Sequence, residues 1–335
     1  MRTRTGRALL TTLAALIGAV AVQGPAAAAP RCFGKRATIV GTGGNDKING
    51  RPGRDVIVGL GGHDRINGRA GDDLICGGGG RDFIRGKSGD DQLSGGAKRD
   101  VVFGQQGLDR VAGGGGSDFL TGNPGNDRIR AGAGGDFVLP GAGDDVAAGE
   151  GGPFDLVSFE GSPVGVIVDL NVTTPQNTNE GIDTLSGFEG VAGSAGNDRI
   201  TGQNVPSQTG NGLFGGGGTD ELLGLDGNDV VVGDEGNDRG GPGIGMVNGG
   251  AGSDIVIGGP GDDDLFGETG NDLLDGFEEA ETVGDFGSGG PDTDECFGIE
   301  TFDPIPANAC ETTARVAAGR LALWEEVPSS GWLTR

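Results

Sequence analysis

Aspartate recurs every nine residues through the first half of the chain, in twelve successive units without a miss. The residues are Asp46, Asp55, Asp64, Asp73, Asp82, Asp91, Asp100, Asp109, Asp118, Asp127, Asp136 and Asp145. Each stands in a glycine-rich stretch, and glycine allows tight turns in which backbone carbonyls point inward. Carboxylate and carbonyl oxygens are the hard ligands that Ca²⁺ prefers in proteins. The spacing therefore predicts a ladder of calcium ligands.

The positions around the aspartate share one pattern from Gly41 to Ala148, G-x-x-G-x-D-x-U-x, in which U is apolar. Position one is Gly except at Ala131 and Pro140, and position four is Gly except at Lys98. We expect the first six residues to form a turn and the last three a short strand, with position eight facing the core. One unit buries a single aliphatic side chain, so the units must stack to be stable.

This unit resembles the hemolysin-type calcium-binding repeat, the RTX nonapeptide. The resemblance implies an all-β fold: a right-handed parallel β-roll, a form of β-solenoid, with two units per turn and strands that alternate between two sheets. It also implies that Ca²⁺ ions lie between stacked turns, held by the position-six carboxylates and by turn carbonyls.

A second, less regular block of repeats follows from Gly193. Its in-phase acids, which we also predict to be calcium ligands, are Asp198, Asp220, Asp229, Asp238, Asp254, Asp263 and Asp272. The unit that starts at Gly233 lacks its last two positions, and the next unit places Gly245 where Asp belongs. We therefore predict the weakest calcium sites around residues 233–248, and weaker sites also at Lys98 and Pro140.

These patterns divide the chain into six segments. They are a signal peptide at 1–29, a lead-in at 30–40, the first block at 41–148, a degenerate repeat with an insertion at 149–192, the second block at 193–295 and a C-terminal cap or tail at 296–335. In the insertion, residues 164–170 and 182–191 read as strands around a polar turn, which predicts a β-hairpin or a bulging loop inserted into the roll. A short helix at 313–326 is expected to form part of the cap.

The first 29 residues have the three parts of a secretory signal: arginines, an apolar stretch too short for a comfortable membrane span, and alanines before Pro30. They predict a secreted, extracellular protein, in which disulfides are permitted. Four cysteines allow three pairings. We favour Cys32–Cys76 and Cys296–Cys310, which would fasten the two ends of the stack.

The composition, with 76 Gly and a formal net charge of −25, would also fit a disordered acidic chain. Disorder requires no fixed phase between aspartates and aliphatic residues, so we expect a chain that folds when calcium removes the repulsion between stacked carboxylates. Such an acidic chain is expected to repel nucleic acid and anionic lipid, and no segment beyond the signal is apolar enough to span a membrane.

The leading functional hypothesis is a secreted protein that binds several Ca²⁺ ions and has no catalytic activity. An alternative is a calcium-stiffened adhesin or matrix protein that uses the insertion or the tail to bind an extracellular or cell-wall partner. A calcium-dependent extracellular hydrolase is the third hypothesis. It is disfavoured because the chain has no HExxH motif and its one histidine, His63, stands in a turn.

Overall fold

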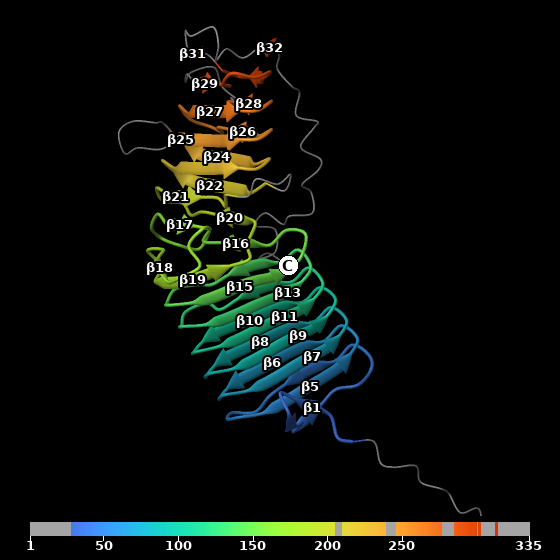
Figure 1. Ribbon diagram of the computed structural model, residues 1–335. Helices are drawn as coiled ribbons and strands as arrows, with labels where there is room; N and C mark the ends of the chain where they lie inside the picture. The colour runs from blue at the N-terminus through green and yellow to red at the C-terminus, as the bar shows by residue number, and fades with distance from the viewer. Residues whose placement is uncertain are drawn as a thin grey trace, which may run out of the picture.

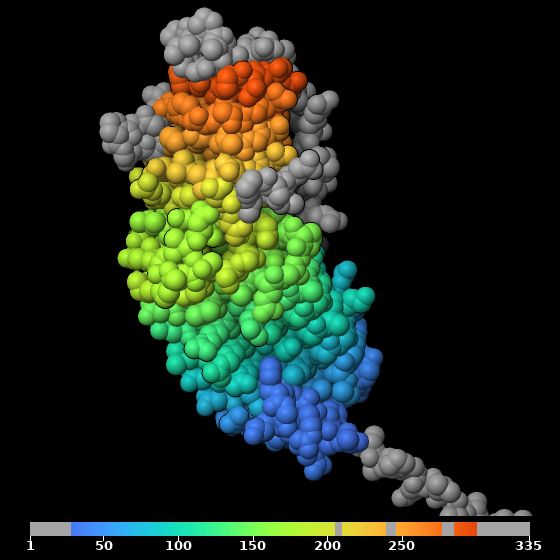
Figure 2. Space-filling model, in the orientation of Figure 1, coloured from blue at the N-terminus to red at the C-terminus, as the bar shows by residue number. Residues whose placement is uncertain are grey.

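The computed structural model describes residues 28–204, 210–238, 246–276, 285–299, 301–302 and 312–313, and all regular elements among them are β-strands. The strands stack into an elongated parallel β-roll (Figures 1 and 2). Within the two blocks of repeats, strands that follow one another in sequence lie in opposite sheets, and each pairs in parallel with the strand one full coil later. The all-β solenoid predicted from the nonapeptide is therefore confirmed.

One wall of the roll is a continuous parallel sheet that runs through both blocks of repeats. Its strands, in spatial order, are β4 (Lys47–Asn49), β6 (Arg65–Ala70), β8 (Phe83–Ser88), β10 (Val101–Gln106), β12 (Phe119–Thr121), β14 (Phe137–Leu139), β16 (Leu156–Ser158), β20 (Gly190–Ala192), β22 (Gly212–Gly218), β24 (Val230–Gly236), β26 (Ile255–Ile257), β28 (Leu273–Asp275), β30 (Glu295–Phe297) and β32 (Thr312–Thr313). We call it the continuous sheet.

The opposite wall is divided into two sheets. The first contains β3 (Ile39–Val40), β5 (Val56–Gly61), β7 (Leu74–Gly79), β9 (Gln92–Ala97), β11 (Arg110–Gly115), β13 (Arg128–Ala133), β15 (Val146–Gly151), β19 (Ile182–Ser186) and β18 (Gln176–Asn177). The second contains β17 (Ile167–Asp169), β21 (Arg199–Thr201), β23 (Glu221–Asp226), β25 (Met246–Ala251), β27 (Asp264–Thr269), β29 (Phe286–Ser288) and β31 (Thr301–Phe302).

The break between these two sheets lies in the region where the sequence predicts a hairpin. A small antiparallel hairpin is present, β18–β19. The strand at 167–169 does not join it, because this strand pairs in parallel with β21 and starts the second sheet. The insertion therefore ends one sheet and begins the next, while the continuous sheet bridges the break through β16 and β20.

The core lies between the two walls and consists mainly of the position-eight side chains. Ile48 stacks on Ile66 in one wall and Ile57 on Ile75 in the other, and both series continue through the two blocks in a single buried cluster. Full burial of one such aliphatic side chain stabilises the fold by about 1.5–3 kcal/mol. The cluster is therefore the main apolar contribution to the stability of the stack.

Most strands of the first block are longer than the sequence predicts. β5 extends from Val56 to Gly61 and so includes the first three positions of the following unit. It continues past Leu60, whose φ of 83° lies in the left-handed region, and Leu60 still pairs with Gly78. The turn is thus confined to positions four to six, and the prediction of a six-residue turn was wrong.

A two-stranded hairpin, β1 (Arg31–Cys32) and β2 (Lys35–Arg36), lies against the start of the first block. Cys32 packs with Val56, Val58 and Leu74, and a disulfide joins it to Cys76 with 5.7 Å between the two Cα atoms. This confirms the first predicted pairing. Cys296 is also disulfide-bonded, but its predicted partner at position 310 lies outside the described residues. So do residues 1–27 of the predicted signal and residues 314–326 of the predicted helix, whose first residue, Thr313, lies in β32.

Candidate metal centre

The position-six aspartates of the first block form two ladders, one along each edge of the roll. Each Asp directly precedes a strand, and from Asp64 onward its Oδ1 accepts a hydrogen bond from the backbone N–H of the Asp one coil earlier. The N···O distance is 2.8 Å from Asp46 to Asp64 and 2.7 Å from Asp55 to Asp73. The same bond repeats up to Asp136 and Asp145. All twelve predicted residues thus occupy equivalent positions.

The ladders continue in the second block, although the sequence period is broken there. One runs through Asp198, Asp220, Asp238 and Asp263, and the other through Asp229, Asp254 and Asp272. All seven predicted residues of this block are buried. The structure therefore aligns every aspartate that the sequence predicts as a ligand.

The second carboxylate oxygen, Oδ2, is buried without a hydrogen-bond partner along most of both blocks. The residues are Asp64, Asp73, Asp82, Asp91, Asp100, Asp109, Asp118, Asp127, Asp136, Asp145, Asp220, Asp229, Asp238, Asp254 and Asp272. Burying a carboxylate oxygen without a partner is costly. A repeated set of such atoms in one structural position indicates that they face a positive ligand.

Most of these oxygens face a backbone carbonyl of the next coil across the position-one glycine. A Cβ placed on Gly68 would lie 2.5 Å from Asp73 Oδ2 and 2.8 Å from the carbonyl oxygen of Gly86. Two hydrogen-bond acceptors thus converge with no donor between them. A hard cation such as Ca²⁺ satisfies this arrangement, since it takes several oxygen ligands at once.

Asn211 is the one described ladder position that carries an amide. Its backbone N–H donates to Asp229 Oδ1, as an aspartate would. Its Nδ2 donates to the carbonyl oxygen of Gly224 at 3.2 Å, the counterpart of the carbonyl that elsewhere faces Oδ2. An N–H donor replaces a carboxylate oxygen here, so this turn satisfies its carbonyl without an ion. The contrast supports a cation at the aspartate turns.

Three predicted ligands differ from the rest because their Oδ2 accepts a hydrogen bond within the turn. The backbone N–H of position two donates to Oδ2 in Asp46, Asp55 and Asp198, each time at 2.6 Å. Asp46 and Asp55 open the two ladders of the first block, and Asp198 lies near the start of the second. These terminal turns satisfy their carboxylates locally.

The interior carboxyls have strongly raised pKa values. The pKa reaches about 8 for Asp100, Asp145 and Asp220, and about 7 for Asp91 and Asp118. Burial is the largest cause. The backbone N–H that each Oδ1 accepts lowers the pKa, and neighbouring ladder carboxylates raise it. A metal-free ladder therefore favours protons near neutral pH, and a divalent cation would remove this penalty.

The ladders also contain acids that sequence reasoning left out. Asp155 and Asp183 extend the first two ladders, and Asp285 and Asp294 extend the last two. Asp155 and Asp183 are each followed two residues later by a buried aliphatic residue, Val157 and Leu185. The pattern D-x-U alone would have found these two. The signal is weaker for the other two, where the same position holds Gly287 and Cys296.

The two defects that the sequence shows near residues 233–248 are one insertion. Asp238 occupies the ladder position directly before β25, although residues 239–245 stand between them in the sequence. Gly245 therefore does not replace an aspartate. The Oδ2 of Asp238 is buried and lacks a partner like the others, so the ladder is complete there.

The side chains alone do not assemble a metal site. Among the described residues, no three His, Cys, Asp or Glu side chains gather closely enough to hold an ion. The hydrogen bond to each Oδ1 keeps the carboxylates one coil apart. Backbone carbonyls must therefore supply much of the coordination, which suits Ca²⁺ better than Zn²⁺.

The stacked turns, with their carboxylates and carbonyls on the edges of a parallel roll, define a calcium-binding β-roll. The model for the RTX calcium-binding nonapeptide repeat (4 copies) matches residues 37–64, 49–84, 85–120, 112–147, 191–204, 214–239 and 239–274, which together make up more than half of the chain. The chain belongs to this family of calcium-binding repeat proteins. No curated protein matches it. In the part of the chain that the structure describes, no helix has the length and apolarity needed to cross a membrane.

Proposed function

We propose that this chain is a secreted protein that binds several Ca²⁺ ions along its two edges and requires them to fold at neutral pH. The observation that carries the proposal is the set of buried Oδ2 atoms, most of which face a carbonyl of the next coil. The proposed ligands are the nineteen predicted aspartates, and calcium binds most strongly at the interior ones. Calcium binds less strongly at Asp46, Asp55 and Asp198, because a backbone N–H already donates to the Oδ2 of each.

The fold supports a structural role for calcium. Ion binding to the native state alone stabilises that state, so binding and folding become one equilibrium. The β-roll is a structural calcium-binding fold, and we propose no catalytic activity for the chain. Dissociation constants of about 10⁻⁴–10⁻³ M would suit a protein that meets calcium only outside the cell.

Far-UV circular dichroism of the mature chain, first in chelator at pH 7.5 and then with added Ca²⁺, tests the proposal. We expect a change from coil to β-structure with Ca²⁺ and a much smaller change with Mg²⁺, which demands a stricter octahedral geometry. Calorimetry would then give the number of ions. A chain that is already folded in chelator and does not respond to calcium would rule the proposal out.

Secretion has its own test. Expression of the full chain with its first 29 residues should release a protein that begins at Pro30, and N-terminal sequencing would detect it. A product retained inside the cell with residues 1–29 intact would contradict secretion while leaving calcium binding untouched.

An adhesin or matrix protein is the second candidate function. Val164, Ile167 and Ile182 lie in the insertion, and nearly half of the surface of each side chain is exposed. Exposed apolar side chains often mark an interaction site. A triple Ser variant at these positions should lose binding to cell-wall extracts, and equal binding by both proteins would exclude this role for the insertion.

A further inference from the structure

The formal charge of the chain is distributed unevenly between the two blocks. The first block, residues 41–148, carries thirteen Lys and Arg against fifteen Asp, and twelve of these Asp belong to the ladders. Beyond residue 148 the chain has five Lys and Arg against thirty-four Asp and Glu. The ladder acids of the first block, apart from Asp46, are buried. Its outer surface is therefore basic, although the whole chain is acidic.

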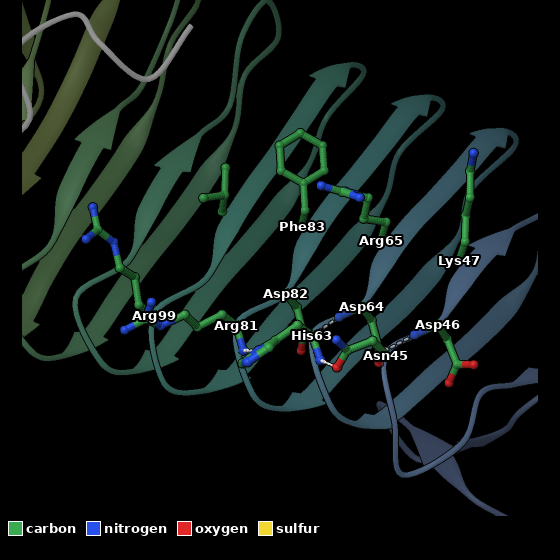
Figure 3. Close-up of a pocket in the computed structure, with 11 residues that line it drawn as sticks. Asn45, Asp46, Lys47, His63, Asp64, Arg65, Arg81, Asp82, Phe83 and Arg99 are labelled. Carbon is green, nitrogen blue, oxygen red and sulfur yellow. Dashed lines mark hydrogen bonds between the residues drawn. The ribbon is translucent and has the colours of Figure 1, made fainter. Parts of the chain in front are cut away.

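Some of these basic residues line an open groove of about 540 Å³ at one edge of the first block (Figure 3). Figure 3 shows Lys47 and Arg65 on the strands of the continuous sheet, and Arg81 and Arg99 on the turns below. The four residues come from four successive coils, at positions seven and five of their units. The groove thus presents about one cation per coil, and coils are about 4.8 Å apart.

Two of these cations have no anionic partner in the part of the chain that the structure describes. Among the described residues, neither Arg65 nor Arg81 forms an ion pair, and both are exposed. The turn beneath them is ordered by backbone bonds, in which Arg81 N–H donates to His63 Nδ1 at 2.8 Å and His63 N–H to Asn45 Oδ1 at 2.7 Å. The ordered turn therefore presents these two unpaired cations to an anionic ligand.

Calcium would control the charge of this groove. The ladder carboxylates Asp46, Asp64 and Asp82 also line it and nearly offset the four cations. If the ladder binds Ca²⁺, as proposed above, that offset disappears and the groove becomes strongly positive. This step rests on the proposed function.

We propose that the calcium-loaded groove binds an acidic polysaccharide along the axis of the roll. A linear polymer with a carboxylate on each sugar repeats its charge along one direction, as the cations of the groove do. Hydrogen-bonded contacts between guanidinium and carboxylate would supply the affinity. A flat anionic membrane that docked on the groove would also approach the acidic second block, which would repel it.

The aromatic residues beside the groove argue against single-stranded nucleic acid as its ligand. Phe83, Phe103, Phe119 and Phe137 form a row on the outer face of the continuous sheet, with neighbouring ring centroids 5.4–6.0 Å apart. The guanidinium of Arg85 lies 4.5 Å from the centroid of the Phe83 ring. The rings already contact one another, and the Phe83 ring also contacts Arg85, so they do not form the open stacking platform that bases require.

Titration of a short polyuronate oligomer into the calcium-saturated mature protein at low salt tests the inference, with the heat of oligomer plus calcium alone subtracted. The Arg65→Gln/Arg81→Gln variant should bind roughly tenfold more weakly, because two charge-assisted contacts are lost. Arg110→Gln/Arg128→Gln is the matched control. It removes the same charge from exposed residues on β11 and β13 of the opposite wall and should bind like the wild type.

Circular dichroism of all three proteins with calcium separates the possible results. A normal calcium response without polyuronate binding overturns the proposed polysaccharide site and leaves calcium binding intact. An equal loss in the control variant also overturns it, as does equally tight binding of an oligo-dT of matched charge or of a neutral glucan. No calcium response in the wild type overturns the proposed function and this inference with it.

Discussion

The two blocks of repeats build the same ladders from sequences of very different regularity. The first block keeps a strict nine-residue period through twelve units. The second inserts residues 239–245 directly after the ladder residue Asp238 and residues 277–284 between Gly276 and Asp285, and yet its ladder bonds continue. What the roll requires is therefore an acid before each strand and an apolar residue within it. The nine-residue period is only the shortest way to supply them.

The largest effect that tests this comparison is the response of the whole roll to pH without calcium. The pKa of Asp100 and of Asp220 rises from 3.8 to about 8 on folding, so the folded metal-free chain binds more protons than the unfolded chain. The stability of the metal-free fold is therefore greatest below pH 4 and is lost as the pH rises towards 8. In chelator, we expect β-structure near pH 4 and coil at pH 8 by circular dichroism.

Calcium should remove this dependence on pH. Protons compete with Ca²⁺ for the ladder carboxylates of the folded chain, so the apparent calcium affinity of the folded roll, measured by calorimetry, should weaken as the pH falls from 8 to 6. Both blocks contain raised carboxyls, and we expect both to respond. A metal-free chain that is as folded at pH 8 as at pH 4 would contradict the ladder energetics.

The next largest effect is removal of a core side chain from each block. Ile84 in the first block and Leu222 in the second are both fully buried at position eight. Truncation of either to Ala should cost about 2–5 kcal/mol of unfolding free energy. Urea denaturation in saturating calcium measures the cost. Similar values would show that the irregular block is packed as well as the regular one, and a cost near zero at Leu222 would show that it is not.

The sequence predicted the part of this structure that depends on a repeated local chemistry. The phase of Asp64 against Ile66 determined which side chain enters the core and which faces the turn, and both positions are as expected. The break at 167–169 was not predictable, because only the sheet pairing shows that this strand joins β21. Asp183 reaches Asp145 across thirty-eight residues of sequence, so the nine-residue period missed it, although its D-x-U pattern was visible.

An exchange between the two kinds of turn should change the number of bound ions. Asp100→Asn gives an aspartate turn the amide that Asn211 has at its own ladder position, and Asn211→Asp gives that turn a carboxylate. We expect the first variant to bind about one ion fewer than the wild type and the second about one more, because each ladder turn supplies one Oδ2 to a calcium site. Calorimetry gives the stoichiometry. Unchanged stoichiometry in both variants would show that Oδ2 is not a ligand.

The smallest effect concerns the irregular turn of the otherwise regular block. Lys98 stands at position four, where every other unit of the block has Gly, and its φ of 80° lies in the left-handed region. Glycine adopts this conformation without strain, so Lys98→Gly should raise the unfolding free energy by roughly 0.5–1 kcal/mol.

Leu108→Gly at position five of the next unit is the control for Lys98→Gly. Leu108 is exposed and has no positive φ, so glycine there only adds freedom to the unfolded chain and should lower stability slightly. Opposite shifts of the two urea midpoints in saturating calcium are expected. Equal shifts would mean that the turn at Lys98 is not held in the left-handed conformation, and that the regular block is less uniform than its aspartates indicate.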